Sequence, residues 1–315
     1  MQSVMNSNEH RTGIDEAYQK KVQKLFTLKD RFGESHPLVI KNLIDLAEIY
    51  LLRGNIREAR DLYGECLAKS RDVNGFQHQT TVTCVHGLAR VYEQQGKLVQ
   101  AEDLLVECLT WQTKKHGCKH IDTLSTMFIL VSVYDSLDKD ILAERLCLEC
   151  VSGFRSVHRQ DHPVALSAIR LLSQLYMHNS RLDEAESAIM EYIPKIKALR
   201  GDMHPESMEG MAVLADICFY RGKFNDADSI YTQCLSSHES NFGRHHLISA
   251  NIMIRLGRCK QNQGETHAAG MLYIESVNIL KDLCGSQHHD TVVVIRLLTK
   301  LYKKQGRTPT GPTLK

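Results

Sequence analysis

The stretch Gly33-Glu34-Ser35-His36-Pro37 contains a short motif, Gly-x-x-His, that returns every 42 residues along the chain. Its further copies span Gly75 to His78, Gly117 to His120, Gly201 to His204, Gly243 to His246 and Gly285 to His288. Arg159 to His162 keeps the histidine and loses the glycine. A fixed period of this length is typical of repeat proteins, in which each repeat is one supersecondary unit that packs on its neighbours.

The residues between two motifs have the pattern of two helices. After Pro37, which suits the first helical position, the apolar residues of the first repeat follow helical spacing at Leu43, Leu46, Ala47 and Tyr50. A second helical face follows the break at Gly54 and carries Ala59, Leu62, Tyr63, Cys66 and Leu67. The Leu46 and Ala59 positions keep their residue type in every repeat. The sequence therefore predicts an all-α solenoid of antiparallel helix pairs.

The period also sets the expected domain organisation. We expect a disordered N-terminal tail over residues 1–13, a solenoid over 14–306 and a flexible C-terminal tail over 307–315. Within the solenoid, a half repeat at 14–32 and another at 285–306 flank full repeats at 33–74, 75–116, 117–158, 159–200, 201–242 and 243–284.

The middle of the array departs from the pattern. The turn between the two helices has Gly54, Gly96, Gly222, Gly264 and Gly306 in five repeats, but Asp138 and Ser180 in the others. Together with the lost glycine at Arg159, these changes predict that residues 135–182 are the least regular part of the solenoid. We expect faster hydrogen exchange there than in the flanking repeats.

The bulk composition excludes several classes of function. Lys plus Arg (39) nearly equals Asp plus Glu (37), so the chain has no global charge that would attract nucleic acid or an anionic membrane. The N-terminus lacks a secretory pattern, and no apolar run approaches the roughly 18 residues that span a bilayer. We expect a cytoplasmic protein whose ten cysteines are reduced.

Histidine and cysteine are the residues that could carry chemistry. Packed repeats lie about 10 Å apart, too far for histidines of neighbouring repeats to share a metal through bonds of about 2 Å. We interpret the histidines as helix caps that accept backbone hydrogen bonds or pack under the preceding helix.

Cys147 and Cys150 have half of a zinc or redox motif, but Cys150 shares its repeat position with Cys66, Cys108 and Cys234, which favours buried apolar packing. The chain also has no phosphate-binding loop, no His-Glu-x-x-His and no Gly-x-Ser-x-Gly. We therefore predict no catalytic residues, no metal, no cofactor and no enzymatic activity.

The repeat core resembles a known family. Leu46-Ala47-x-x-Tyr50, the turn at Gly54 and Ala59-x-x-x-Tyr63 resemble the tetratricopeptide repeat, and the 42-residue period with Gly-x-x-His-Pro between units is similar to the kinesin light chain type. Two features differ from kinesin light chains: residues 1–32 do not repeat apolar residues at heptad spacing, and the Leu-Asn-Asn-Leu-Ala motif of that family reads Leu43-Ile44-Asp45-Leu46-Ala47 here. The resemblance implies a right-handed superhelix whose concave wall is built from the first helices.

The resemblance also implies a non-enzymatic scaffold or adaptor that holds an extended or helical peptide of another protein in this groove. The candidate groove positions carry five basic side chains against two acidic ones, with apolar Ile44, Phe128 and Ile254 among them, so we expect the peptide to have acidic and apolar residues. The alternative is a cargo-adaptor subunit of a microtubule motor, similar to a kinesin light chain. Binding of nucleic acid or a membrane is not expected. The candidate groove residues are the outward positions of the first helices: Ile44, Glu48, His86, Arg90, Phe128, Ser132, Arg170, Gln174, Ala212, Asp216, Ile254, Arg258, Arg296 and Lys300.

Overall fold

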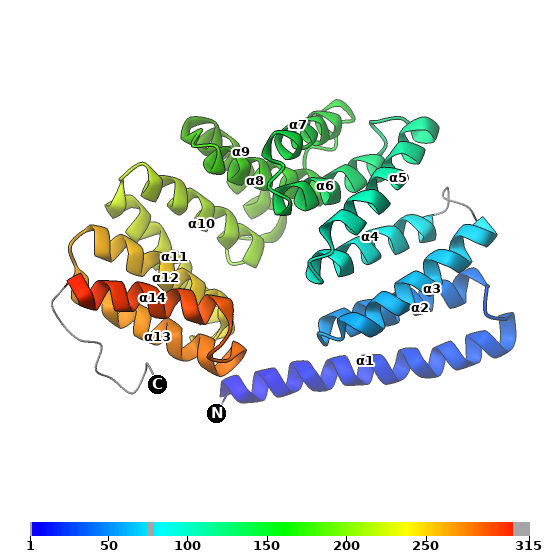
Figure 1. Cartoon of the computed structure of the whole chain (residues 1–315), viewed down its shortest axis with the longest axis horizontal. Coiled ribbons are helices and arrows are strands. Elements are labelled where there is room, and N and C mark those ends of the chain that lie inside the picture. The colour runs from blue at the N-terminus through cyan, green and yellow to red at the C-terminus, as the bar shows by residue number, and fades with distance from the viewer. Residues whose placement is uncertain (1, 75–78, 305–315) are drawn as a thin grey trace. The chain divides into compact units, whose positions relative to one another are not determined.

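The computed structural model describes residues 2–74 and 79–304, and every regular element in these residues is an α-helix (Figure 1). The first half of the chain forms α1 (Gln2–Phe32), α2 (Pro37–Leu52), α3 (Ile56–Asn74), α4 (Gln79–Gln94), α5 (Leu98–His116), α6 (Ile121–Ser136) and α7 (Asp140–Ser156). The second half forms α8 (Pro163–His178), α9 (Leu182–Arg200), α10 (Pro205–Tyr220), α11 (Phe224–Phe242), α12 (Leu247–Asn262), α13 (Thr266–Cys284) and α14 (His289–Lys304).

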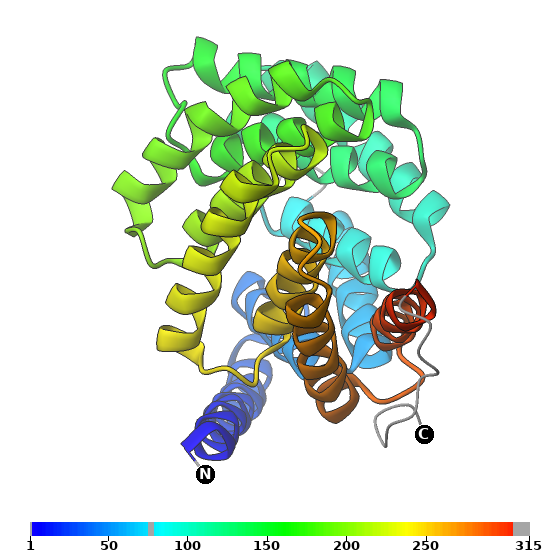
Figure 2. The same ribbon diagram turned by 90° about the vertical axis from the view of Figure 1, so that its left-hand side faces the viewer.

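The helices alternate between the two positions of the repeat. Even-numbered helices from α2 onward are the first helices of their repeats and odd-numbered helices are the second. Consecutive helices pack on each other from α1 to α7 and from α9 to α14, and α12 and α13 lie side by side in both views (Figures 1 and 2). The predicted all-α helical repeat solenoid is therefore confirmed.

The chain divides into two compact units, Met1–Ala168 (unit 1) and Ile169–Lys315 (unit 2). Each unit has its own apolar core between its helices. The small residue of the second helix is completely buried in all six full repeats, at Ala59, Ala101, Ala143, Ala185, Ala227 and Ala269. Ala17 of α1 is exposed, because the half repeat has no first helix of its own to cover it.

Six of the repeated histidines cap a first helix. In each case the imidazole Nδ1 accepts a hydrogen bond of 3.2–3.4 Å from the backbone N–H two residues further on, as in His36 to Leu38 and His246 to Ile248. Three of the rings also stack on the preceding helix, His36 on Phe32, His120 on His116 and His162 on Phe154. The structural interpretation of the histidines is confirmed for these six; His78 lies outside the described residues.

The irregular middle of the array has a distinct backbone. Asp138 and Ser180 adopt the left-handed conformation, with φ of 55° and 59°, at the turn position that glycine holds elsewhere. Near Arg159 the left-handed residue is His158, with φ of 53°, and α7 ends two residues earlier in its repeat than α9 does. Because L-residues pay about 1–2 kcal/mol for this conformation, residues 138–180 contain three strained turns. Faster hydrogen exchange there stays a prediction.

Helix α1 is longer than the apolar pattern indicates. It begins at Gln2, whereas the pattern predicts a helix from Ile14 and a disordered tail before it. No proline interrupts residues 2–32, and extending an existing helix costs far less than starting one. Among the described helices, none combines the length and the apolar composition that a bilayer span requires.

Candidate functional site

Two adjoining clefts lie on the first helices of unit 2. The first cleft has a volume of about 340 Å³ and is lined by Arg170, Gln174, Pro205, Met208, Glu209, Ala212, Val213, His238, Ile248, Asn251, Ile252 and Arg255. The second has a volume of about 750 Å³ and is lined by Gln174, Met177, His178, Ser180, Leu182, Asp216, Tyr220, Arg255 and Arg258. Gln174 of α8 and Arg255 of α12 line both clefts, so the two form one continuous candidate site.

Five candidate groove residues meet in these clefts. Arg170, Gln174 and Ala212 line the first cleft, and Gln174, Asp216 and Arg258 line the second. They come from α8, α10 and α12, which hold equivalent places in three successive repeats. The 42-residue period therefore aligns one helix face from repeat to repeat.

A charged network links the clefts. Arg255 is paired with the Asp216 carboxylate, which also accepts a hydrogen bond from the Tyr231 hydroxyl. Burial raises the pKa of Asp216, although the neighbouring Arg255 acts in the opposite direction. Arg258 lies over the Phe219 ring, with its guanidinium carbon 4.9 Å from the ring centre. Its cationic group is thus held beside the second cleft on an aromatic surface.

The rim of the first cleft combines both signs of charge. Arg170 donates a hydrogen bond of 3.3 Å to Gln174, and its Nε lies 3.7 Å from the Glu209 carboxylate. The floor contains the apolar side chains of Met208, Val213 and Ile252, all of which are buried. An apolar floor with a few polar groups around it is the usual construction of a ligand pocket.

Two candidate residues of unit 1, Ile44 and His86, are less accessible than their repeat position predicts. Ile44 is only 7% exposed and belongs to the apolar core, so it does not present a free surface. His86 is half-buried and hydrogen-bonds Thr126 of α6 at 2.7 Å. Burial lowers the pKa of His86 to about 4. Both residues share a repeat position that faces the next first helix, and packing of successive first helices covers it.

The other candidates of unit 1 lie at or near the surface. Glu48 accepts a hydrogen bond of 2.6 Å from the Tyr63 hydroxyl, and the exposed Arg90 lies 3.5 Å from the same carboxylate. Phe128 of α6 is half-buried. Ser132 is also half-buried and donates to the Ile129 carbonyl at 2.8 Å.

Three candidates of unit 2 do not line the two clefts. Ile254 is half-buried and packs against the apolar core of unit 2. Arg296 and Lys300 are exposed on α14. The structure thus brings together the candidates of α8, α10 and α12, and leaves those of α14 apart from this site.

Arg255 and His238 also line the first cleft, although neither is among the residues predicted from the sequence. The positions equivalent to Arg255 in the other repeats are Asp45, Gly87, Ile129, Leu171, Val213 and Leu297. Because this position varies from apolar to charged, the repeat pattern alone does not identify Arg255 as a cleft residue. His238 lies in the second helix, where no groove residue is expected.

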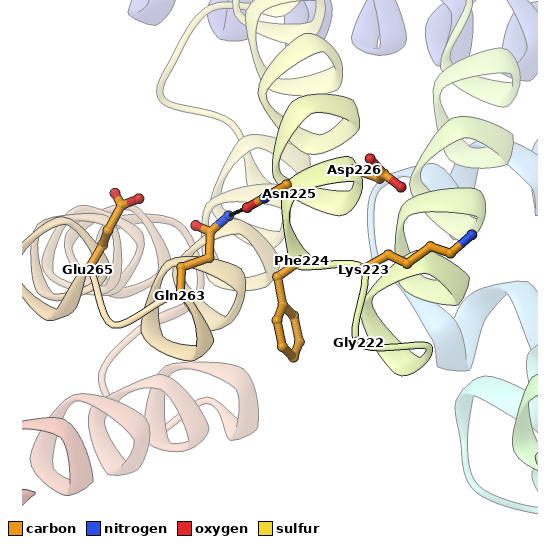
Figure 3. Close-up of a pocket in the computed structure, with 7 residues that line it drawn as sticks. All are labelled: Gly222, Lys223, Phe224, Asn225, Asp226, Gln263 and Glu265. Atoms are coloured by element: carbon orange, nitrogen blue, oxygen red, sulfur yellow. Dashed lines mark hydrogen bonds between the residues drawn. The ribbon is translucent and has the colours of Figure 1, made fainter.

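A third cleft, of about 530 Å³, lies at the turn between α10 and α11 (Figure 3). It is lined by Gly222, Lys223, Phe224, Asn225, Asp226, Gln263 and Glu265. Gln263 donates a hydrogen bond of 2.9 Å to Asn225, which joins the turns of two repeats. The Lys223 side chain points away from Gln263 and Glu265 (Figure 3). We interpret this cleft as a joint between repeats.

The thiol and metal chemistry of the described residues is limited. Cys66, Cys108, Cys150 and Cys234 are all buried, and burial raises the pKa of Cys150 to about 12. A thiol with such a pKa is a poor nucleophile at neutral pH. Within residues 2–74 and 79–304, no three His, Cys, Asp or Glu side chains are grouped to hold a metal ion.

Comparison with known proteins identifies the repeat. Residues 43–80 and 83–107 each match the tetratricopeptide repeat. No curated protein sequence matches the chain.

Three solved structures illustrate the likeness of the fold. A putative kinesin light chain with nearly identical TPR-like repeats from Podosopora anserina is 22% identical, with a TM-score of 0.56 over 63% of this chain and 93% of that one. The apo quorum sensor NprR from B. thuringiensis is 15% identical, with a TM-score of 0.63 over 96% and 84%. NprR in complex with its cognate peptide NprX is 13% identical, with a TM-score of 0.62 over 96% and 86%.

Proposed function

Because this chain is a tetratricopeptide repeat protein, we propose that it is a non-enzymatic scaffold that holds a peptide segment of a partner protein. The peptide lies along α8, α10 and α12, in the two adjoining clefts of unit 2. The observation that carries this proposal is the gathering of Arg170, Gln174, Asp216 and Arg258 in these clefts. We further propose that the protein works in the cytoplasm, where its cysteines stay reduced.

The chemistry of the clefts favours a peptide with both acidic and apolar residues. Arg170, Arg255 and Arg258 supply three cationic groups, against Glu209 and Asp216 as the anionic ones. An acidic side chain of the peptide would pair with Arg258, whose guanidinium is exposed. Apolar side chains would enter the first cleft. The peptide complex of NprR, a structure of similar fold, supports peptide binding by this type of scaffold.

The second candidate function is that of a cargo adaptor similar to a kinesin light chain. The likeness to the putative kinesin light chain repeats of Podosopora anserina favours it. This alternative predicts that the protein co-purifies with a kinesin heavy chain. Absence of the heavy chain from a crosslinked complex that contains other partners would remove the alternative and leave the scaffold proposal intact.

The scaffold proposal is tested by selecting peptides from a random display library on the full-length protein. We expect selected peptides enriched in Asp or Glu together with large apolar residues. Affinity measured by fluorescence anisotropy should fall at least about tenfold in Arg258→Glu, because the substitution replaces an attraction by a repulsion. Arg200→Glu is the matched control: it makes the same charge change at an exposed residue at the end of α9. Equal affinities for wild type and Arg258→Glu would contradict the proposal.

A further inference from the structure

His238 of α11 is a buried histidine that the helix-capping pattern does not explain. Its side chain is 1% exposed, and its Nδ1 lies 3.0 Å from the Ser249 hydroxyl oxygen of α12. Ser249 donates its own hydrogen to the Gly243 carbonyl at 3.3 Å. Ser207 and Thr291, at the same repeat position, also donate to the carbonyl of their repeat's glycine. Ser249 is therefore an acceptor toward His238, and Nδ1 carries the proton.

This proton position leaves Nε2 of His238 as a hydrogen-bond acceptor. Burial and the nearby His246, whose ring centre is 4.8 Å away, lower the pKa of His238, so the imidazole is neutral at neutral pH. Nε2 is shielded from solvent and has no hydrogen-bond partner among the described residues. A buried acceptor without a donor costs about 1–3 kcal/mol. A ligand that supplies the donor would recover this cost.

The neighbouring repeats of unit 2 show that packing does not require a histidine here. The equivalent residues are Ile196 and Leu280, which are 2% and 0% exposed. Each fills the same space between two helices with an apolar side chain. The imidazole thus places an unsatisfied polar atom at a position where leucine or isoleucine packs in the neighbouring repeats.

His238 lies in the lining of the first cleft, which is otherwise mainly apolar at its floor. Met208, Val213, Ile248 and Ile252 line the same cleft, as do Arg170 and Arg255. Met208 has an unbranched and adaptable side chain, so the floor can adjust to a bound side chain at small cost. The volume of about 340 Å³ is at the lower end of the range for ligand pockets.

We propose that the first cleft is a specificity pocket for an aromatic side chain with a hydrogen-bond donor at its tip, a tyrosine or tryptophan, and that Nε2 of His238 accepts that hydrogen bond. The assignment of this side chain to a bound peptide rests on the proposed scaffold function. An aliphatic or phenylalanine side chain fills the cleft but leaves Nε2 unsatisfied. Serine or threonine supplies a donor but leaves the apolar floor uncovered, and a cationic side chain meets Arg170 and Arg255.

The test uses small aromatic probes on the full-length protein, so it does not depend on the partner. Titrations of p-cresol against toluene, and of 3-methylindole against 1,3-dimethylindole, compare each donor with a close analogue that lacks it. Ring resonances of His238 in NMR spectra report binding at the site. We expect at least one donor to bind about tenfold more tightly than its analogue, because only the donor satisfies Nε2. The stronger donor distinguishes a tyrosine pocket from a tryptophan pocket.

His238→Leu is the matched variant, since Leu280 holds the equivalent position. It should bind toluene at least as tightly as wild type, which demonstrates an intact cleft, and should lose the preference for p-cresol. Ser249→Ala is a second variant, with Ala165 as its natural counterpart, and should reduce the preference because Nδ1 loses its acceptor.

Equal affinities for donor and analogue in the wild type, or no binding of any probe, would overturn the pocket assignment. So would a preference that persists in His238→Leu. None of these results bears on the Arg258→Glu test, so failure of the pocket and failure of the scaffold proposal are distinguishable.

Discussion

Residues His86 to Arg90 of α4 and Ile254 to Arg258 of α12 hold the same place in repeats of unit 1 and unit 2. In the repeat before each region, a buried tyrosine of the second helix donates to a carboxylate of the first helix, Tyr63 to Glu48 in unit 1 and Tyr231 to Asp216 in unit 2. Both regions end in an exposed arginine, Arg90 or Arg258. The repeat has therefore kept one tyrosine, carboxylate and arginine arrangement in both units.

The two regions differ at one position between these groups. Unit 1 has Gly87, where an added Cβ would lie 2.2 Å from the Tyr63 ring. Unit 2 has Arg255, which reaches the Asp216 carboxylate instead. The Asp216 side chain is 21% exposed and that of Glu48 is 43% exposed. The tyrosine is buried in both units, but only in unit 2 does this helix position supply a charge, and that charge lines both clefts.

The largest expected effect comes from removing the glycine of unit 1. Gly87→Ala should lower the free energy of unfolding by about 2–3 kcal/mol, because the new methyl group overlaps the buried Tyr63 ring. Urea unfolding followed by the fluorescence of Trp111, the single tryptophan, reports on unit 1. Gly64→Ala is the control, since its Cβ would meet nothing within 4 Å, and it should gain up to about 1 kcal/mol from helix propensity. Similar changes in both variants would contradict the role of Gly87.

A smaller effect should follow from removing the extra charge of unit 2. Arg255→Leu should destabilise α12 by about 1–2 kcal/mol, because Asp216 is left partly buried without its partner. Arg90→Leu in unit 1 should cost less than about 0.5 kcal/mol, because the Arg90 and Glu48 pair is exposed. Hydrogen exchange of α12 and α4 in the two variants gives the comparison. An equal loss of protection in both would mean that burial of Asp216 does not distinguish the units.

The smallest expected effect is the loss of stability of unit 1 at acidic pH, which depends on His86. His86 of unit 1 has a pKa of about 4 in the folded protein, below the usual 6.5, so the unfolded state binds more protons between these values. The contribution of His86 to the free energy of unfolding is fully present above pH 6.5 and is lost as the pH falls toward 4. The free energy of unfolding should fall by about 1 kcal/mol between pH 7 and pH 5.5 for this reason. Unit 2 has Ile254 at this position. His86→Ile should therefore reduce the acid sensitivity of Trp111-detected unfolding. An unchanged pH dependence would show that His86 does not titrate as its burial requires.

Much of the fold could be predicted from the sequence because the signals are local and repeated. Helix spacing, the turn glycines and the histidine caps each depend on residues within a few positions of one another. Asp138 and Ser180 were recognisable as irregular turns for the same reason, and both have the left-handed backbone. The shift of the left-handed residue from Arg159 to His158 was not predictable, because it depends on where α7 ends.

The candidate site was predicted only in part. Spacing placed Arg170, Gln174, Asp216 and Arg258 on one face, and they do line the clefts. Spacing also included Ile44, which packing of α2 against α4 buries. A residue near the edge of a helix face is buried or exposed according to the size of the side chains on the first helix of the next repeat. The 42-residue period does not predict the size of those side chains.

The sequence by itself determined the 42-residue repeat, the helix pairs and the histidine caps, because hydrogen bonding and apolar spacing along a helix are properties of nearby residues. The tertiary structure alone decided that Arg255 meets Asp216, that Gly87 admits Tyr63 and that Nε2 of His238 lacks a donor. These features join residues that are 11 to 39 positions apart in the chain or depend on the proton of a hydroxyl in the next repeat. Contacts of this kind arise only when the helices pack.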